Sequence, residues 1–194
     1  MNNCPFFCQR YLVYAILFII TIATNSCNSH KIENKIMKMQ SEVIKIKTNR
    51  MICLADSGKR IRKESLKWIV YHDSVACKPC QIAHISDWDK ILRLKGVDCY
   101  FIFSAKSCEV EKYIEAYRNK KIEANVYLDT ANIFVRDNPQ IPYETIYHKF
   151  LVDENNSVLL VGNPINNKSI SELFLKILDT RIQGLEARMN KDEL

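Results

Sequence analysis

Two cysteines separated by two residues, Cys77 and Cys80, carry the most specific chemistry in this sequence. At the start of a helix such a pair can close a small disulfide, and the exposed N–H groups of the first turn stabilise a thiolate on the first cysteine. Cys77 is therefore the expected nucleophile. Lys78 adds a positive charge beside it, and Pro79 suits a first helical turn because its missing N–H would have no partner there.

The same spacing also occurs in zinc sites and in purely structural disulfides, so both remain alternatives. A structural zinc site needs a second pair of Cys or His ligands at comparable spacing. Cys99 and Cys108 are nine positions apart, and His72 and His84 flank the motif without a metal-type arrangement. We therefore expect no metal, and no cofactor beyond the dithiol itself.

The neighbouring residues predict that the pair lies where a strand turns into a helix. Residues 66–71 form a short, nearly continuous apolar run, as a buried central strand requires. From residue 78 to residue 94 the apolar positions recur mostly at steps of three and four, which indicates an amphipathic helix. The cysteines lie at the junction of these two elements.

The rest of the chain alternates in the same way. We expect strands at residues 97–103, 124–128, 145–152 and 157–161, and helices at residues 109–121, 131–136 and 169–189. Ser169 or Ser171 is available to cap the last helix. A βαβ unit followed by a ββα unit predicts an α/β fold whose central mixed sheet carries helices on both faces.

Several side chains are expected inside this fold. Trp68, Phe101 and Phe103 are interpreted as core residues. Cys53, Cys99 and Cys108 are interpreted as buried thiols, although Cys53 with a partner would suit a structural bridge.

The run from Trp68 to Cys80 resembles the redox site of thioredoxin-like proteins, particularly the membrane-tethered TlpA-like thiol-disulfide oxidoreductases. Residues 149–162 are similar to the penultimate hairpin of that family, and the resemblance covers residues 66–178. It implies a three-layer thioredoxin-like fold with an N-terminal extension. It also implies that Cys77 attacks a substrate disulfide and that Cys80 resolves the mixed disulfide.

The sequence departs from the family at three positions. Ala76 replaces the tryptophan before the first cysteine, Ala83 replaces an acidic residue, and Tyr147 stands near the place of the cis-proline that presents the substrate. The substrate groove is accordingly assigned to Lys78, Pro79 and Tyr147. His84, which follows Cys80 by four residues, and Asp73 are the candidate proton carriers.

The N-terminal residues predict export. Residues 11–23 carry no charge, and such a run is too short to span a bilayer but suits a signal-peptide core. Ser26 before Cys27 resembles part of the lipobox of bacterial lipoproteins, which implies a lipid on Cys27. An ordinary signal peptide or an uncleaved anchor is the alternative, and the ending Lys191 to Leu194 also matches a retention signal of the endoplasmic reticulum.

These features predict three regions. Residues 1–26 are a lipoprotein-type signal peptide, residues 27–49 a tether with Ile32, Ile36 and Met39 at helical spacing, and residues 50–190 the thioredoxin-like domain. Residues 43–47 and 50–55 are weak strand patterns in the extension. The expected location of the protein is the periplasm or cell envelope, as a membrane-anchored lipoprotein, and the alternative is the lumen of the endoplasmic reticulum.

The net charge of +6 is spread along the chain rather than gathered in one run, so we expect no nucleic-acid partner. The expected partners are protein thiols or disulfides, and the membrane through the lipid on Cys27. The function predicted first is a thiol-disulfide oxidoreductase. A thioredoxin-like binding module without turnover and a lumenal redox protein remain the alternatives.

Overall fold

The computed structural model describes residues 30–54, 66–73, 82, 85, 97–118, 122, 124–165 and 167–192, with side chains up to residue 181. The chain divides into two compact units, Met1–Lys38 and Met39–Leu194. In the first unit the described residues are helical, in agreement with the spacing of Ile32 and Ile36. None of the described helices combines the length and the apolar character that crossing a bilayer requires. The apolar residues 11–23 and Cys27 lie outside the described residues.

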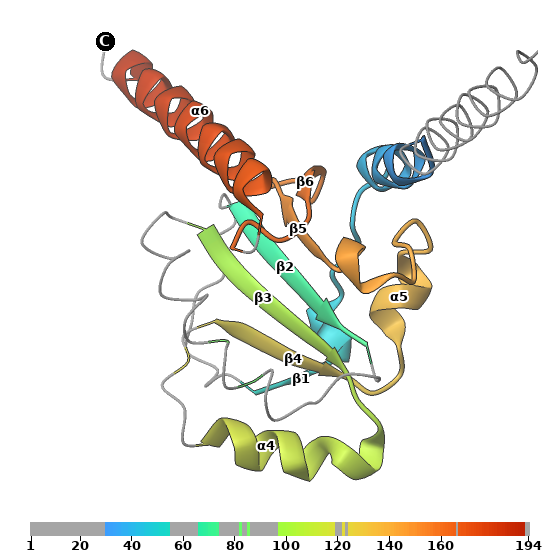
Figure 1. The fold of residues 1–194 in the computed structure, drawn as a ribbon. Helices are drawn as coiled ribbons and strands as arrows, with labels where there is room; N and C mark the ends of the chain where they lie inside the picture. Colours follow the sequence, from blue (N-terminus) through green and yellow to red (C-terminus); the bar gives the residue numbers. More distant parts are fainter. Residues whose placement is uncertain are drawn as a thin grey trace, which may run out of the picture. The chain divides into compact units, whose positions relative to one another are not determined.

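The second unit is built on one mixed sheet whose strands lie in the order β1, β4, β3, β2, β5, β6 (Figure 1). Strand β2 pairs parallel with β3, and β3 pairs parallel with β4. Strand β5 pairs antiparallel with both β2 and β6, and β1 pairs antiparallel with β4. The six strands are β1 Ile52–Cys53, β2 Leu66–His72, β3 Val97–Ser104, β4 Asn125–Asp129, β5 Lys149–Val152 and β6 Val158–Val161. The predicted α/β fold with a central mixed sheet is confirmed.

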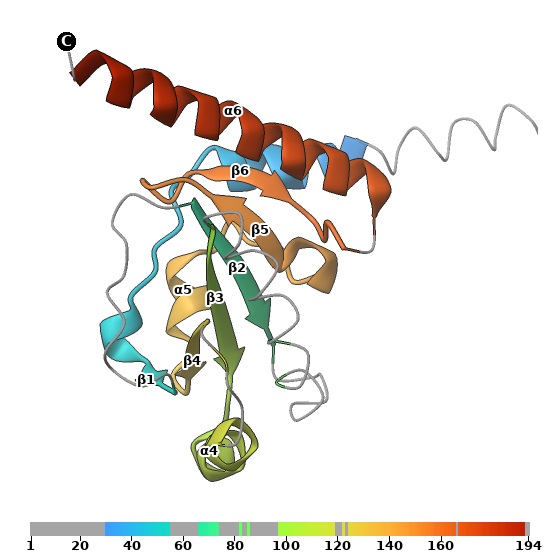
Figure 2. The ribbon, with the colours of Figure 1, turned by 90° about the vertical axis from the view of Figure 1, so that its left-hand side faces the viewer.

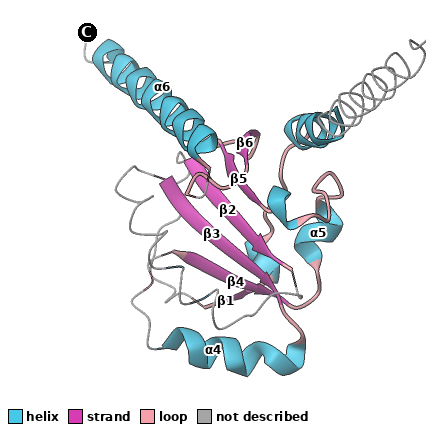
Figure 3. Cartoon of the chain, viewed as in Figure 1, coloured by secondary structure: helices cyan, strands magenta, loops and turns pink. Residues whose placement is uncertain are grey.

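Helices surround this layer of strands (Figure 3). The α-helices of the second unit with printed bounds are α4 Val110–Arg118, α5 Ile133–Asp137 and α6 Lys168–Asp192, and the short 3-10 helices are η1 Thr48–Arg50, η2 Ser107–Glu109 and η3 Thr145–Tyr147. Between β2 and β3 the structure describes Ile82 and Ile85, both helical and both buried. They lie in the segment predicted to be a helix from its apolar spacing.

The two faces of the sheet bury different side chains, because neighbouring residues of a strand point to opposite sides. Trp68 and Val70 of β2 belong to one core cluster with Ile82 and Ile85. Tyr71, on the opposite face, packs against Phe134 of α5 with ring centroids 5.4 Å apart. Figure 2 shows α5 and η1 on the same side of the strands. Ile82 and Ile85 therefore pack on the face of Trp68 and Val70.

The core prediction is confirmed for Trp68, Phe101 and Phe103, which are all buried. Of Cys53, Cys99 and Cys108, only Cys99 is buried as predicted. The prediction is wrong for Cys53 and Cys108, which are exposed. Cys53 lies on β1, which is the outermost strand on its side of the sheet, and Cys108 lies in the short helix η2.

The prediction of a strand over residues 145–152 is wrong in its first half. The N–H of Tyr147 donates to the carbonyl of Glu144 at 3.0 Å, and the N–H of His148 donates to that of Thr145 at 3.1 Å. These bonds close the 3-10 helix η3, so β5 begins only at Lys149. Local turn formation there overrides the strand pattern.

The last helix begins one residue earlier than predicted, and its cap is different. Asn167 accepts the N–H of Ile170 on its side-chain oxygen at 3.1 Å, so Asn167 rather than Ser169 or Ser171 occupies the capping position. Asparagine and serine are almost equivalent as caps, and the sequence offers both here.

The N-terminal extension is held by Asn138 rather than by a strand over residues 43–47. The side chain of Asn138 accepts the N–H of Lys45 at 2.8 Å and donates to the carbonyl of Lys45 at 2.9 Å. It also donates to the carbonyl of Phe134 at 2.7 Å. Val43 forms only an isolated bridge with Ser157.

Candidate functional site

A pocket of about 560 Å³ lies at the edge of the sheet where β2 and β6 end and β5 begins. Strands β2 and β3 are parallel, so both of their carboxyl ends reach this edge. In open α/β sheets ligands bind preferentially outside the carboxyl ends of the strands. The pocket is therefore our candidate functional site.

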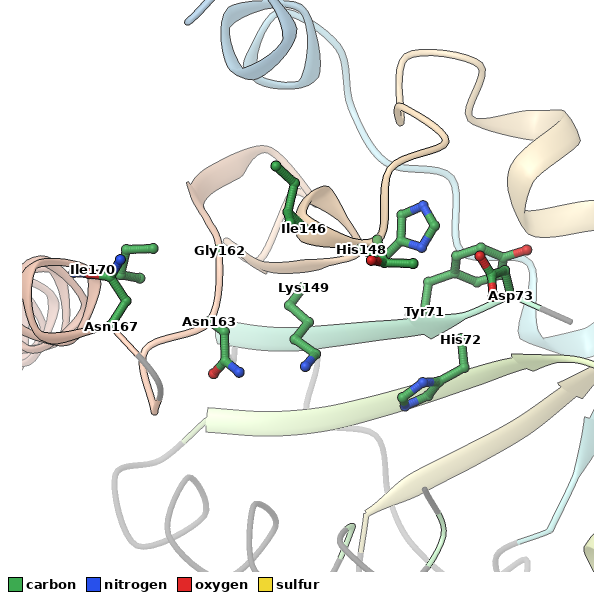
Figure 4. Close-up of a pocket in the computed structure, with 11 residues that line it drawn as sticks. Tyr71, His72, Asp73, Ile146, His148, Lys149, Gly162, Asn163, Asn167 and Ile170 are labelled. Atoms are coloured by element: carbon green, nitrogen blue, oxygen red, sulfur yellow. Dashed lines mark hydrogen bonds between the residues drawn. The ribbon is translucent and has the colours of Figure 1, made fainter. Parts of the chain in front are cut away.

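Four segments line the pocket (Figure 4). They are the end of β2, the stretch from η3 into β5, the turn after β6 and the start of α6. In chain order the lining residues are Tyr71, His72, Asp73, Thr145, Ile146, His148, Lys149, Gly162, Asn163, Asn167 and Ile170.

Lys149 is the first residue of β5 and pairs with Val70 of β2. Its side chain is half-buried, and burial lowers the pKa of its ammonium group below the ordinary lysine value. Within the described part of the chain this ammonium makes no hydrogen bond and no ion pair. The pocket thus contains a positive charge with no partner among the described residues.

His72 is the last residue of β2, and its ring stacks on that of Phe103. Burial, with a smaller effect of the nearby Lys149 ammonium, lowers the pKa of His72 to about 4. The Asp73 carboxylate raises the pKa of His72, but by less than burial lowers it. At neutral pH the imidazole is therefore uncharged.

Gly162 shapes the wall beside Lys149. Its N–H donates to the carbonyl of Lys149 at 2.8 Å, and its φ of +121° is one that side-chain-bearing residues rarely adopt. A Cβ at this position would lie 2.5 Å from Cδ1 of Ile170. Glycine therefore permits both the turn and the close approach of α6.

The two asparagines that line the pocket use their oxygens for the local backbone. Oδ1 of Asn163 accepts the N–H of Ile165 at 3.0 Å, and Oδ1 of Asn167 accepts the N–H of Ile170 at 3.1 Å. The groups left for a ligand are therefore their amide N–H donors.

His148 is buried and its ring packs against that of Tyr71. Its Nε2 lies 2.9 Å from the carbonyl oxygen of Pro142. A carbonyl only accepts, so Nε2 carries the proton. Nδ1 is buried and has no hydrogen-bond partner in the described part of the chain.

The structure describes two of the residues that the sequence assigned to the site. Asp73 lines the pocket. The side chain of Tyr147 is buried, and its neighbours Ile146 and His148 line the pocket instead. The other assigned residues, Cys77, Lys78, Pro79, Cys80, His84 and the lipidation residue Cys27, lie outside the described residues. Among the residues that are described, no three His, Cys, Asp or Glu side chains gather in a way that could hold a metal ion.

Sequence reasoning missed Lys149, Asn163 and His148 as pocket residues. Lys149 comes directly before the buried run of β5, and Asn163 follows β6 closely, so both are polar residues at strand ends. That signal alone is weak, because only the order of the strands brings these ends to one edge.

No family model and no curated protein matches this chain. Solved structures do resemble it. A protein from Chlorobium tepidum assigned as the thiol:disulfide interchange protein DsbE has 17% identity and a TM-score of 0.46, and the match covers 71% of this chain and 99% of that one. An uncharacterized thioredoxin-like protein from Porphyromonas gingivalis has 16% identity and a TM-score of 0.46, covering 66% of this chain and 86% of that one. The thioredoxin domain of a thiol-disulfide oxidoreductase from Bacteroides vulgatus has 12% identity and a TM-score of 0.41, covering 60% and 81%.

These similarities concern only the path of the backbone, and they give no information about the activity of this chain. The fold class rests on the strand order itself, in which a parallel pair, β3 and β2, continues into an antiparallel hairpin, β5 and β6, followed by a helix. This α/β strand order agrees with the thioredoxin-like fold that the sequence resemblance predicts.

Proposed function

We propose that this chain is a thiol-disulfide oxidoreductase that works outside the cytoplasm and exchanges disulfides with protein substrates through Cys77 and Cys80. The observation that carries the proposal is the position of the motif in the chain, directly after the central strand β2. The pocket at the end of that strand lies next to it in sequence, because Asp73 lines the pocket and precedes Cys77 by four residues.

Chain connectivity supports a dithiol near the pocket. Consecutive Cα atoms are about 3.8 Å apart, so the Cα of Cys77 lies within about 15 Å of that of Asp73. By the same limit the Cα of Cys80 lies within about 8 Å of that of Ile82, a core residue on the Trp68 face. Both limits are compatible with a dithiol near the pocket.

The proposed reaction needs only the two thiols. The thiolate of Cys77 attacks one sulfur of a substrate disulfide, the substrate S–S bond breaks, and the departing substrate sulfur takes a proton. Cys80 then attacks the sulfur of Cys77 and releases the second substrate thiol. The substrate gains two electrons, and the protein is left with a Cys77–Cys80 disulfide. The same steps in reverse oxidise a substrate dithiol.

The remaining assigned residues support these steps in the proposal. Lys78 favours the thiolate of Cys77, Pro79 stiffens the loop between the sulfurs, and the backbone near Tyr147 forms part of the substrate groove. Asp73 or His84 carries the proton that Cys80 gives up before it attacks.

The test compares cysteine variants in an insulin-reduction assay with dithiothreitol as the electron donor. Cys77→Ser should abolish the catalysed rate, and Cys80→Ser should accumulate a mixed disulfide between Cys77 and the substrate. Cys108→Ser, which alters an exposed cysteine outside the motif, is the matched control and should retain full activity. Undiminished exchange by Cys77→Ser would refute the proposal, and so would a Cys77 pKa at or above about 8.5.

A second candidate is a binding module that keeps the fold without turnover. The observation in its favour is the buried side chain of Tyr147 near the place where the resembled family has its substrate-presenting proline. Such a module should bind unfolded protein equally well in the wild type and in Cys77→Ser, and it should show no insulin reduction.

We further propose that a lipid on Cys27 anchors the protein to the membrane of a bacterial cell envelope. Labelled palmitate should enter the wild type, and Cys27→Ser should lose both the label and the membrane association. Membrane association that persists in Cys27→Ser would favour an uncleaved anchor. Secretion after removal of the last four residues in eukaryotic cells would instead favour the lumen of the endoplasmic reticulum.

A further inference from the structure

We propose that Lys149 and Asn163 form a subsite that binds a carboxylate of the substrate, so that the protein prefers disulfides in acidic peptide segments. This inference names the substrate class of the proposed oxidoreductase and rests on that function. The subsite lies in the pocket at the carboxyl end of β2, and its residues come from β5 and from the turn after β6.

The position of Lys149 in β5 fixes the face of the sheet from which its side chain projects. Lys149 pairs with Val70 in the antiparallel register of β5 and β2, so the two side chains project from the same face of the sheet. Val70 belongs to the core cluster that contains Ile82 and Ile85. Lys149 therefore projects from the face of the sheet on which Ile82 and Ile85 pack.

The ammonium groups of Lys67 and Lys149 have different surroundings. Burial lowers the pKa of both Lys67 and Lys149. The ammonium of Lys67 donates to the carbonyls of Asp153 and Glu154 and to Oδ1 of Asn156, at 3.4, 3.1 and 2.9 Å, and nearby carboxylates partly offset its desolvation. Lys149 has neither an acceptor nor a compensating carboxylate in the described part of the chain.

A half-buried charge without a partner is costly, and such groups cluster at functional sites. A carboxylate from a ligand would give the Lys149 ammonium the acceptor that the described residues do not provide. It would also form a charge-assisted hydrogen bond, which is stronger than a neutral one.

The side chains near Lys149 in the pocket also favour an anionic ligand. Figure 4 shows the side chains of Lys149 and Asn163 extending to the same side of β2 as that of His72. Asn163 has its oxygen engaged with Ile165, so it offers its amide N–H groups. His72 is uncharged and neither attracts nor repels an anion strongly.

Asp73 is the one carboxylate that lines the pocket among the described residues. Figure 4 shows it beside Tyr71, at the opposite end from Asn163. It repels a second carboxylate from its own end of the pocket, which directs the ligand to the end with Lys149 and Asn163. The exposed side chain of Ile146 adds an apolar surface for a neighbouring residue of the peptide.

The test uses two synthetic peptide disulfides that differ only in Glu or Gln beside the cysteine. The wild type should exchange the Glu peptide about tenfold faster, as one well-placed charge interaction predicts. Lys149→Met should reduce the ratio to within about twofold, and Lys149→Arg should keep most of it. Lys112→Met removes the same charge from an exposed position on α4 and should leave the preference intact.

Asn163→Asp is the second variant, and it keeps an oxygen for the N–H of Ile165 while replacing the amide donor by a negative charge. It should abolish the preference for the Glu peptide. Raising the ionic strength should weaken the preference in the wild type, because salt screens a partly exposed charge. Equal rates for the two peptides in the wild type, or an unchanged preference in both Lys149→Met and Asn163→Asp, would overturn the inference.

A binding measurement separates this inference from the proposed function. Cysteine-free versions of the two peptides carry a fluorescent label, and their anisotropy reports binding without any redox step. The Glu version should bind about tenfold more tightly than the Gln version, and Lys149→Met should remove the difference. If exchange is absent but this difference is present, the oxidoreductase proposal fails while the subsite stands. If exchange depends on Cys77 but the difference is absent, the subsite alone fails.

Discussion

The imidazole of His72 lies flat against the ring of Phe103, with ring centroids 4.7 Å apart and ring planes 11° apart. The two residues are direct partners in the parallel pairing of β2 and β3. The stacked position removes the ring from water, which disfavours its charged form. The end of the central strand therefore carries a neutral imidazole, five positions before Cys77 in the sequence.

This position predicts a stability that depends on pH. The unfolded chain binds a proton on His72 at the ordinary pKa of 6.5, whereas the folded chain binds it only at about 4. Between these values the unfolded state holds more protons, so the free energy of unfolding should fall as the pH drops from 6.5 to 4. The loss attributable to His72 should reach roughly 3 kcal/mol.

Chemical denaturation across this range, with His72→Phe as the comparison, measures that loss. The variant keeps an aromatic ring against Phe103 but has no proton to gain, so its stability should fall less. NMR titration should place the His72 midpoint near 4. A His72 midpoint near 6.5 would contradict the prediction.

Gly162→Ala should destabilise the protein by about 1–3 kcal/mol. The substitution forces a side chain into a φ of +121° and places its Cβ against Ile170. Urea denaturation measures the effect. Gly184→Ala is the matched control, because Gly184 lies within α6, where alanine is the better helix former, and it should be neutral or slightly stabilising. Equal effects of the two substitutions would show that the turn does not need glycine.

Asn138→Ala should cost about 1–3 kcal/mol, because it leaves the backbone N–H and carbonyl of Lys45 without their side-chain partner. The amide of Lys45 should also exchange its hydrogen much faster in the variant. Asn155→Ala, at an exposed position in the hairpin turn, should change the stability by less than about 0.5 kcal/mol. Unchanged exchange at Lys45 in Asn138→Ala would mean that Asn138 does not hold the extension.

The cysteines outside the motif should differ in their reactivity with iodoacetamide. Cys53 and Cys108 are exposed and should be alkylated in the native protein, whereas Cys99 is only 1% exposed and should react only after unfolding. Peptide mapping by mass spectrometry after a short pulse of reagent shows the order in which these cysteines are alkylated. Rapid native labelling of Cys99 would place it outside the core cluster to which it belongs here.

Local patterns predicted the elements well where the apolar side chains of an element are buried in the core. The apolar run at residues 66–71 became β2, and the spacing within residues 109–121 predicted α4. The predictions were wrong where local turn chemistry competes with the pattern. At residues 145–147 the N–H groups bond within the turn, so a stretch that resembles a strand forms η3.

The sequence by itself determines three features: the dithiol motif with its predicted chemistry, the alternation of strands and helices, and the apolar core. These features depend on side-chain type and on the period of each element. The pocket was decided only by the tertiary structure. Lys149 and Asn163 meet the end of β2 because β5 pairs beside it, and such pairing depends on contacts between distant parts of the chain. The ammonium of Lys67 has acceptors 86 to 89 positions away, whereas that of Lys149 has none among the described residues. This contrast arises in the same way, since nothing local distinguishes the two lysines.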